Sequence, residues 1–147
     1  MIVVDTNVVS ELMRPSPSAV VVGWVHRYER ELYTTSITLA EIRYGIERLP
    51  DGRRKELLRS TAGEVFADFE ERVLPFDAEA AVAYATIVSS RDRTGLPIDG
   101  FDAQIASISR SHRAGLATRN TKDFQDTGIE TIDPWQEEQP TPTDPDQ

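Results

Sequence analysis

The sequence predicts an α/β fold in which helices cover both faces of a mostly parallel sheet. Short apolar segments alternate with longer amphipathic segments along the chain, as in successive βαβ units. The length of 147 residues fits one domain with a substantial core. The first apolar segment, residues 1–4, ends abruptly on Asp5, at the edge where parallel sheets bind ligands.

In the N-terminal third, the sequence predicts two strands and two helices in alternation. After the first strand, Pro15 and Pro17 interrupt the chain. Residues 20–31 begin apolar and end charged, which predicts an amphipathic helix, and residues 31–37 predict the second strand. The next helix ends near residue 49, and its apolar face comprises Leu39, Ile42, Ile46 and Leu49.

The remainder of the chain continues this alternation. Residues 53–72 predict a long helix. Asp77 is placed to cap an alanine-rich helix over residues 78–93, and Asp99 begins a further helix that ends before Gly115. The remaining predicted strands are residues 73–76, 116–118 and 129–132.

The C-terminal composition divides the chain into two parts. Residues 1–135 carry all the predicted strands and helices and form one domain. Residues 136–147 are rich in proline and acidic residues and contain no aliphatic side chain, so we expect a disordered acidic tail.

Composition excludes several kinds of protein. The sequence has no cysteine, which excludes disulfides and thiolate metal sites, and its histidines, His26 and His112, lack the spacing of common zinc ligands. No apolar run approaches the roughly 20 residues of a membrane span, so we expect a cytoplasmic protein. The net charge of −9 argues against binding nucleic acid by overall electrostatics.

Four acids fall at similar junctions along the chain and are candidates for one site. They are Asp5, Glu41, Asp102 and Asp123. Each has a purely structural alternative. Asp5 can cap the following helix. Glu41 ends the sequence Thr38-Leu39-Ala40-Glu41, which matches a capping box and would lie in the first helical turn.

The two later acids have close competitors. Asp99 and Asp102 lie three residues apart in the first turn of one helix, where Asp99 is the better cap and Asp102 the better functional candidate. Asn120 and Asp123 both follow the strand over residues 116–118, and a turn without function is the alternative for both.

A cluster of these carboxylates would need a cation. Two carboxylates about 4 Å apart repel by about 4 kcal/mol at an effective dielectric constant of about 20, so one would otherwise take up a proton. Oxygen ligands suit Mg²⁺ or Mn²⁺. Such a metal binds phosphate oxygens and activates a water molecule, which lets an acidic protein cut a polyanion.

Four motifs in order resemble those of PIN-domain ribonucleases, above all the VapC-type toxins of bacterial toxin–antitoxin pairs, including the FitB-like branch. The similarity extends from Met1 to about Trp135. The motifs are Asp5-Thr6-Asn7, residues 36–46, residues 96–106 and residues 116–124.

The resemblance implies three α/β/α layers around a five-stranded parallel sheet, and Mg²⁺- or Mn²⁺-dependent cleavage of RNA. It assigns Asp5, Glu41 and Asp102 to an acidic metal site, with Asp5 and Asp102 holding the cation. Asp123 is the expected fourth acid, with Asn120 as a neutral ligand or water positioner. The small polar residues that orient these groups correspond to Thr6 and Thr118.

The resemblance also implies partners. Relatives commonly form homodimers, and a small antitoxin with a basic C-terminal segment near the acidic pocket holds them inactive, at times in higher assemblies. The negative charge of this chain suits such a partner. Eight basic residues are candidates to contact RNA phosphates, although a solvated helix face is the commoner role for each: Arg43, Arg48, Arg53, Arg54, Lys55, Arg110, Arg113 and Arg119.

Two other functions fit parts of the pattern. Enzymes that form an aspartyl phosphate also place an aspartate after an apolar strand, but they usually carry a second aspartate two residues later, where this chain has Asn7. The other alternative is a non-catalytic module whose acids only cap helices or dock a basic partner.

Overall fold

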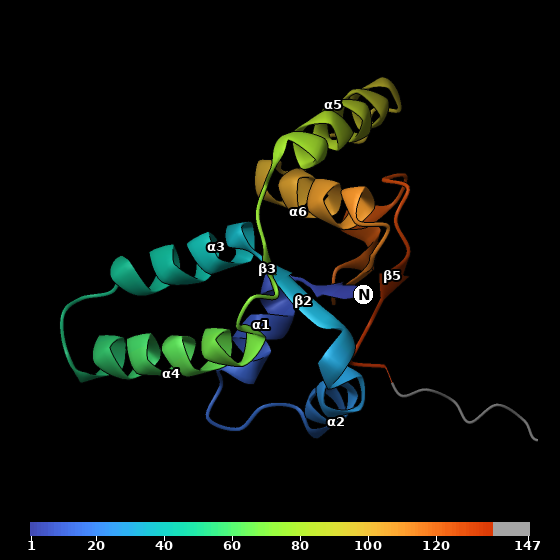
Figure 1. Cartoon of the computed structure of the whole chain (residues 1–147). Coiled ribbons are helices and arrows are strands. Elements are labelled where there is room, and N and C mark those ends of the chain that lie inside the picture. Colours follow the sequence, from blue (N-terminus) through green and yellow to red (C-terminus); the bar gives the residue numbers. More distant parts are fainter. Residues whose placement is uncertain (137–147) are drawn as a thin grey trace, which may run out of the picture.

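Five parallel strands form one sheet in the order β3-β2-β1-β4-β5, in a computed structural model that describes residues 1–136 (Figure 1). The central strand β1 pairs with β2 through Ile2 and Leu32 and with β4 through Val4 and Ala117. The strands are β1 (Ile2–Val4), β2 (Leu32–Thr35), β3 (Val73–Leu74), β4 (Gly115–Ala117) and β5 (Thr131–Ile132). The predicted five-stranded parallel sheet is confirmed.

Helices cover both faces of this sheet. The helices α5 and α6 lie above it in Figure 1, α1 and α2 lie below it, and α3 and α4 form a hairpin that projects to one side. The helices are α1 (Thr6–Leu12), α2 (Ala19–Tyr28), α3 (Ser36–Glu47), α4 (Arg53–Phe69), α5 (Ala78–Arg93) and α6 (Gly100–Ser111). Two short 3-10 turns, η1 (Glu29–Glu31) and η2 (Thr121–Phe124), complete the described part of the chain.

Alternating side chains of the central strand divide the core into two clusters. Val3 is fully buried and packs in one cluster with Ile87 of α5 and Ile105 of α6. Val4 points to the opposite face and packs in the other cluster with Val8 of α1 and Val21 of α2. Since successive strand residues face opposite sides, one short strand anchors both helical layers.

The predicted boundaries differ from the observed ones where hydrogen-bonding side chains or unusual backbone angles set them. The strand predicted over residues 31–37 ends at Thr35, because the Thr35 hydroxyl accepts from the Thr38 backbone N–H and starts α3 at Ser36. The helix predicted to run to residue 72 ends at Phe69, where Glu70 adopts a φ of 49°.

Two predicted caps are confirmed, and one prediction lies beyond the structure. The Asp77 carboxylate accepts from the Ala80 N–H and caps α5, and Asp99 caps α6. The predicted tail, residues 136–147, lies outside the described residues from residue 137 onward. None of the helices within residues 1–136 combines the length and the apolar character that crossing a bilayer requires.

Phe124 belongs to the core cluster that contains Val3. Its ring is only 2% exposed and anchors η2, the turn that follows β4. We expect Phe124→Ala to lower the free energy of unfolding by about 3–5 kcal/mol, through lost burial and the cavity left behind. Urea unfolding measures this. Phe101→Ala is the control, since that ring is 53% exposed and its loss should change stability by less than about 0.5 kcal/mol. Equal losses would contradict the assignment of the core.

Candidate active site

A pocket of about 490 Å³ opens where the chain leaves β1 and β4. It gathers three of the four predicted acids, Asp5, Glu41 and Asp102, which come from β1–α1, α3 and α6. The pocket is lined by Asp5, Thr6, Asn7, Ser10, Glu11, Arg14, Glu41, Asp102, Arg119, Asn120 and Trp135. The parallel topology accounts for this convergence, because the exits of neighbouring strands share one edge of the sheet.

Asp5 is fixed at the end of the central strand. Its backbone N–H donates to the Ala117 carbonyl at 2.9 Å, and its side chain is only 4% exposed. One carboxylate oxygen accepts from the Thr6 N–H at 2.7 Å, and the other accepts from the Thr118 hydroxyl at 2.8 Å. Asp5 is therefore the cap of α1 and also a buried acid of the pocket.

Burial dominates the ionisation of Asp5. It raises the pKa of this carboxyl above its usual range, and the nearby negative charge of Asp123 acts in the same direction. The hydrogen bonds from Thr118 and Thr6 oppose the rise in pKa, because they stabilise the carboxylate. The ionised form therefore depends on these donors, and a nearby cation would favour it further.

At the floor of the pocket, Thr118 links the residues that follow β4 to those that follow β1. It is fully buried, and while its hydroxyl donates to Asp5 the same oxygen accepts from the Asn7 side-chain amide at 3.2 Å and the Asn120 N–H at 3.1 Å. The role predicted for this residue, orienting an acid, agrees with these contacts. Asn7 adds a long contact of 3.4 Å to the second oxygen of Asp5.

Glu41 is held by a chain of hydroxyl groups. The Thr6 hydroxyl donates to Glu41 Oε1 at 2.9 Å and lies 3.1 Å from the Thr38 hydroxyl, to which the Thr35 hydroxyl donates at 3.4 Å. Burial raises the pKa of Glu41, and the charges of Asp5 and Asp99 add to this effect.

The capping-box interpretation of Glu41 is wrong. Thr35, not Thr38, caps α3, so Thr38 is the third helical residue and Glu41 lies in the second turn rather than the first. Thr35 accepts from the Thr38 backbone N–H, a free donor of the first helical turn, and the Glu41 carboxylate accepts from the Thr6 hydroxyl across the pocket.

Asp102 experiences the combined charge of the other acids. Asp99 caps α6 by accepting from the Phe101 and Asp102 N–H groups at 3.0 and 3.4 Å, which makes Asp102 the third helical residue, as predicted. Burial raises the pKa of Asp102 to about 7, and the charges of the four acids Asp5, Asp99, Asp123 and Glu41 contribute in that order. Burial is thus the larger cause of the raised pKa of Asp102, and the neighbouring acids at this edge of the sheet add to it.

The two competitors for the fourth ligand occupy different positions. Asn120 lines the pocket. Asp123 is exposed on η2 and is not part of the lining, but its charge raises the pKa of Asp5 and Asp102. The Asp123 carbonyl accepts from the buried guanidinium of Arg91 at 3.2 Å, which ties this turn to α5.

Several lining residues were not among the predicted site residues. Asn7, Ser10, Glu11 and Arg14 recur at the spacing of one helical face, and this periodicity could have revealed them. Glu11 is 7% exposed, accepts from the Ser18 N–H at 2.9 Å and pairs with Arg14 at 3.2 Å. The Ser18 N–H and Arg14 lower the pKa of Glu11, so this acid is already compensated within the protein.

The donor set fits a hydrated divalent cation. Within residues 1–136, no three acidic or imidazole side chains stand close enough together to ligate a metal directly. Mg²⁺ needs no such group, because it usually keeps several water ligands and binds to one or two carboxylates. Burial and the repulsion of the other acids raise the pKa of Asp102, and a cation would relieve that repulsion.

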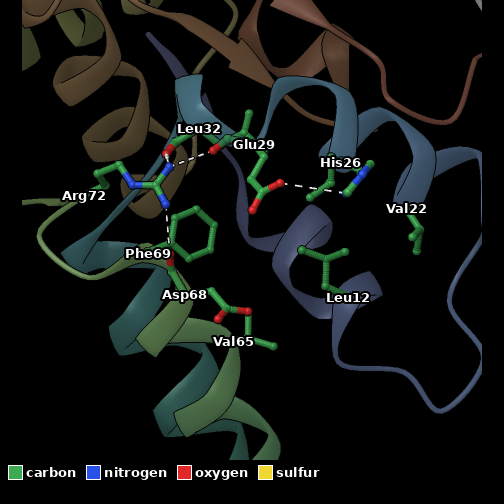
Figure 2. A pocket seen from close by; sticks show the side chains of 10 residues that line it. Leu12, Val22, His26, Glu29, Leu32, Val65, Asp68, Phe69 and Arg72 are labelled. Atoms are coloured by element: carbon green, nitrogen blue, oxygen red, sulfur yellow. Dashed lines mark hydrogen bonds and ion pairs between the residues drawn. The ribbon is translucent and has the colours of Figure 1, made fainter.

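A second hollow of about 380 Å³ lies beside α1, α2, β2 and α4 (Figure 2). Arg72 spans one side of it and donates to the carbonyl groups of Glu29, Leu32 and Asp68 at 2.7, 2.8 and 2.8 Å. His26 lies 3.8 Å from the Glu29 carboxylate. The two acids that line this hollow, Glu29 and Asp68, are both exposed, so the pocket that contains Asp5 remains the candidate for catalysis. The apolar wall comprises Leu12, Val22, Val25, Val65 and Phe69.

Comparison with protein families finds that residues 2–130 match the PIN domain. The chain belongs to the PIN-domain family. The matched range includes all four acids of the motifs, Asp5, Glu41, Asp102 and Asp123.

Known proteins resemble this PIN domain over nearly all of its length. VapC ribonuclease Y4jK of Sinorhizobium fredii is 38% identical over 138 residues, covering 92% of this chain and 99% of that protein. Toxin FitB of Neisseria gonorrhoeae is 36% identical over 137 residues, with the same two shares, 92% and 99%. The structure of FitAB bound to an IR36 DNA fragment has a TM-score of 0.87 at 35% identity and covers 95% of this chain and 99% of that one. The predicted membership of the VapC-type branch is confirmed.

Thr118→Val tests the pocket floor of the PIN domain, because it removes the hydroxyl and keeps the shape. Asp5 loses a donor, while Asn7 and Asn120 lose an acceptor. We expect the free energy of unfolding to fall by about 1–3 kcal/mol and the pKa of Asp5 to rise further. Carboxyl NMR and urea unfolding measure the two effects. Thr118→Ser should leave the pKa unchanged; a pKa that rises equally in both variants would contradict the role of the hydroxyl.

Asp102→Asn should stabilise the metal-free PIN domain. The folded pKa of about 7 exceeds the unfolded value of 3.8, so the folded state holds the proton more tightly and the wild-type protein loses stability as pH rises through this window. We expect the variant to gain about 1–2 kcal/mol relative to wild type between pH 4 and 7 and to keep that gain above it, after allowance for the partial exposure of Asp102. Unfolding in chelator at several pH values measures it. A difference in free energy of unfolding between the variant and wild type that stays the same at every pH would contradict the raised pKa of Asp102.

Proposed function

We propose that this protein is a metal-dependent endoribonuclease and the toxin of a type II toxin–antitoxin pair, which hydrolyses phosphodiester bonds in RNA. One observation carries the proposal: acids from three distant segments line one pocket, and their mutual repulsion helps raise the pKa of Asp102 to about 7. The names of the relatives support it, since one is a VapC ribonuclease and another is toxin FitB. The cytoplasm, where RNA is made, is the proposed place of action.

Asp5 and Asp102 hold the cation, Mg²⁺ or Mn²⁺, in this proposal. Asp5 is rigid because both its oxygens accept hydrogen bonds, and Asp102 presents its carboxylate from the first turn of α6. A cation held there would offer positive charge to the scissile phosphate and would make a nearby water molecule more acidic. The nucleases of this family are generally metal-dependent, and the choice between Mg²⁺ and Mn²⁺ is part of the proposal.

The remaining residues position the reactants. Glu41, whose carboxylate is held by Thr6, orients the attacking water and accepts its proton, for which its raised pKa is suited. Asp123 adds negative charge that strengthens cation binding, and Asn120 serves as a neutral ligand or water positioner. Asp99 contributes as the cap of α6 and through its charge on Asp102.

An antitoxin partner is also proposed. Solved structures of relatives include toxin–antitoxin complexes, some of them bound to DNA, such as FitAB and VapBC of Salmonella typhimurium. A basic segment of a small antitoxin would meet the acidic pocket and block the cation, and the net charge of −9 favours such a partner. A homodimer is proposed as the toxin's own assembly, and larger toxin–antitoxin assemblies would be built from it.

Asp5→Asn and Asp102→Asn test the proposal, since each keeps size and removes a metal-binding charge. We expect cleavage of total RNA by the purified, partner-free protein to fall at least about 100-fold in both, and chelator to abolish wild-type cleavage. Sequencing of the new ends gives the rates and sites. The matched control is Glu64→Gln, an exposed acid of α4, which should cleave normally.

Three results would overturn the assignment. Wild-type cleavage rates in the folded Asp5→Asn and Asp102→Asn proteins would exclude the acids from catalysis. A phosphoryl group trapped on Asp5 would favour an aspartyl-phosphate enzyme instead. The absence of any metal binding in a titration would favour a non-catalytic module.

A further inference from the structure

The pocket has a second half with the opposite charge. Arg14, Arg119 and Trp135 line it together with the acids. Cation binding requires none of these three side chains. Basic and aromatic groups beside a proposed cation site are the combination that binds single-stranded nucleic acid, through phosphate charge and base stacking.

Arg119 is fixed beside Asp5 by both its backbone and its side chain. Its N–H donates to the Asn7 side-chain oxygen at 3.2 Å, and the Asn7 amide contacts Asp5. Its guanidinium carbon lies 5.1 Å from the centroid of the Trp135 ring. This cation–π contact places the cation over the indole and restricts its motion.

Trp135 is a firm support for that cation. The ring is partly buried and packs against the core cluster that contains Val4 and Ala117, and the Trp135 backbone N–H donates to the Asp133 carboxylate at 2.9 Å. The core thus holds the ring in place, and the Arg119 guanidinium lies over it. The exposed Arg119 side chain therefore offers its remaining surface to a ligand in the pocket.

Arg14 adds a second positive charge at the same rim. Its side chain is 64% exposed, and its pairing with buried Glu11 uses one terminal nitrogen, Nη1. The ion pair places the arginine at the pocket while leaving further N–H donors for a phosphate.

Other basic residues occupy different sites. Of the eight candidates from the sequence, Arg119 is the one that lines this pocket within the described residues. Lys55 is buried and donates to the Glu47 carbonyl, and Arg110 and Arg113 line a separate hollow beside Gly115, at the other end of β4. The local geometry therefore selects one candidate, and it adds Arg14 and Trp135.

We propose that Arg14, Arg119 and Trp135 form the subsite for the single-stranded nucleotide that flanks the scissile phosphate. A nucleobase stacks on the Arg119 guanidinium, which Trp135 supports, and Arg14 binds a backbone phosphate. The proposal rests on the proposed ribonuclease function and adds the requirement for an unpaired base. A paired base has both faces covered by its neighbours, so it is not available to stack on Arg119.

Binding and cleavage measured separately distinguish this subsite from the nuclease itself. Binding of a short single-stranded RNA is measured with the Asp102→Asn protein over a range of salt concentrations. We expect Arg14→Gln to reduce the slope of log affinity against log salt by about 0.7, the value for one phosphate contact on a single strand. Arg119→Lys should keep the slope and weaken binding about tenfold, because lysine retains the charge without a stacking plane.

Cleavage kinetics with the otherwise wild-type protein give the second readout. Arg119→Lys and Trp135→Leu should raise KM about tenfold and leave kcat within about twofold, since stacking acts on the bound nucleotide in ground and transition states alike. Arg30→Ala is the control, because Arg30 is not among the candidate RNA contacts and is exposed in η1, directly before β2, at the opposite end of the sheet from the pocket. If Trp135→Leu does not fold, Arg119→Lys carries the test alone.

The outcomes separate the two proposals. Normal cleavage with unchanged KM, and binding unchanged in Arg14→Gln and Arg119→Lys, would overturn the subsite and leave the nuclease intact. RNA binding that depends on both arginines, with no cleavage by the wild-type protein, would support the subsite and overturn the nuclease. A double-stranded RNA bound as tightly as the single strand would overturn the stacking role.

Discussion

Repulsion among carboxylates that share one partly buried pocket is the constraint on which the functional edge of this protein depends. Asp5 ends the central strand and is almost fully buried, and Glu41 and Asp102 share its pocket. Neutral donors hold two of them: the Thr6 backbone N–H and the Thr118 hydroxyl donate to Asp5, and the Thr6 hydroxyl donates to Glu41. Neutral donors orient a carboxylate without neutralising it, so the negative potential remains available to a cation.

The fold produces this arrangement through the central position of β1. Val3 and Val4 anchor the two helical layers, and the residue that follows them is the acid. Neighbouring parallel strands β2 and β4 deliver Thr35 and Thr118 to the same edge, and each hydroxyl begins a hydrogen-bond chain that reaches a carboxylate. Crowding the acids lowers the stability of the folded protein, and the core packed behind them offsets that loss. Functional sites in other proteins often lower stability in the same way.

The sequence was sufficient to predict most of the fold and the main acids. The exit of the first strand pointed to Asp5, the first turn of a helix pointed to Asp102, and the caps Asp77 and Asp99 followed from local chemistry. The capping box at Thr38 failed because two overlapping threonines, Thr35 and Thr38, both satisfy the local pattern, and only the pairing of β2 decides where the strand ends. Trp135 was not predicted to contact Arg119, because that contact depends on the path of the chain after β5 rather than on spacing in sequence.

The most direct test of the account is the position of a bound cation. Crystals of the metal-free protein soaked in Mn²⁺ at neutral pH or above would reveal the ion by its anomalous scattering. The account predicts a peak in the acidic pocket within ligand distance of the Asp5 or Asp102 carboxylate, directly or through one water molecule. A peak only at other acids of the surface, or none in this pocket at millimolar Mn²⁺, would contradict it.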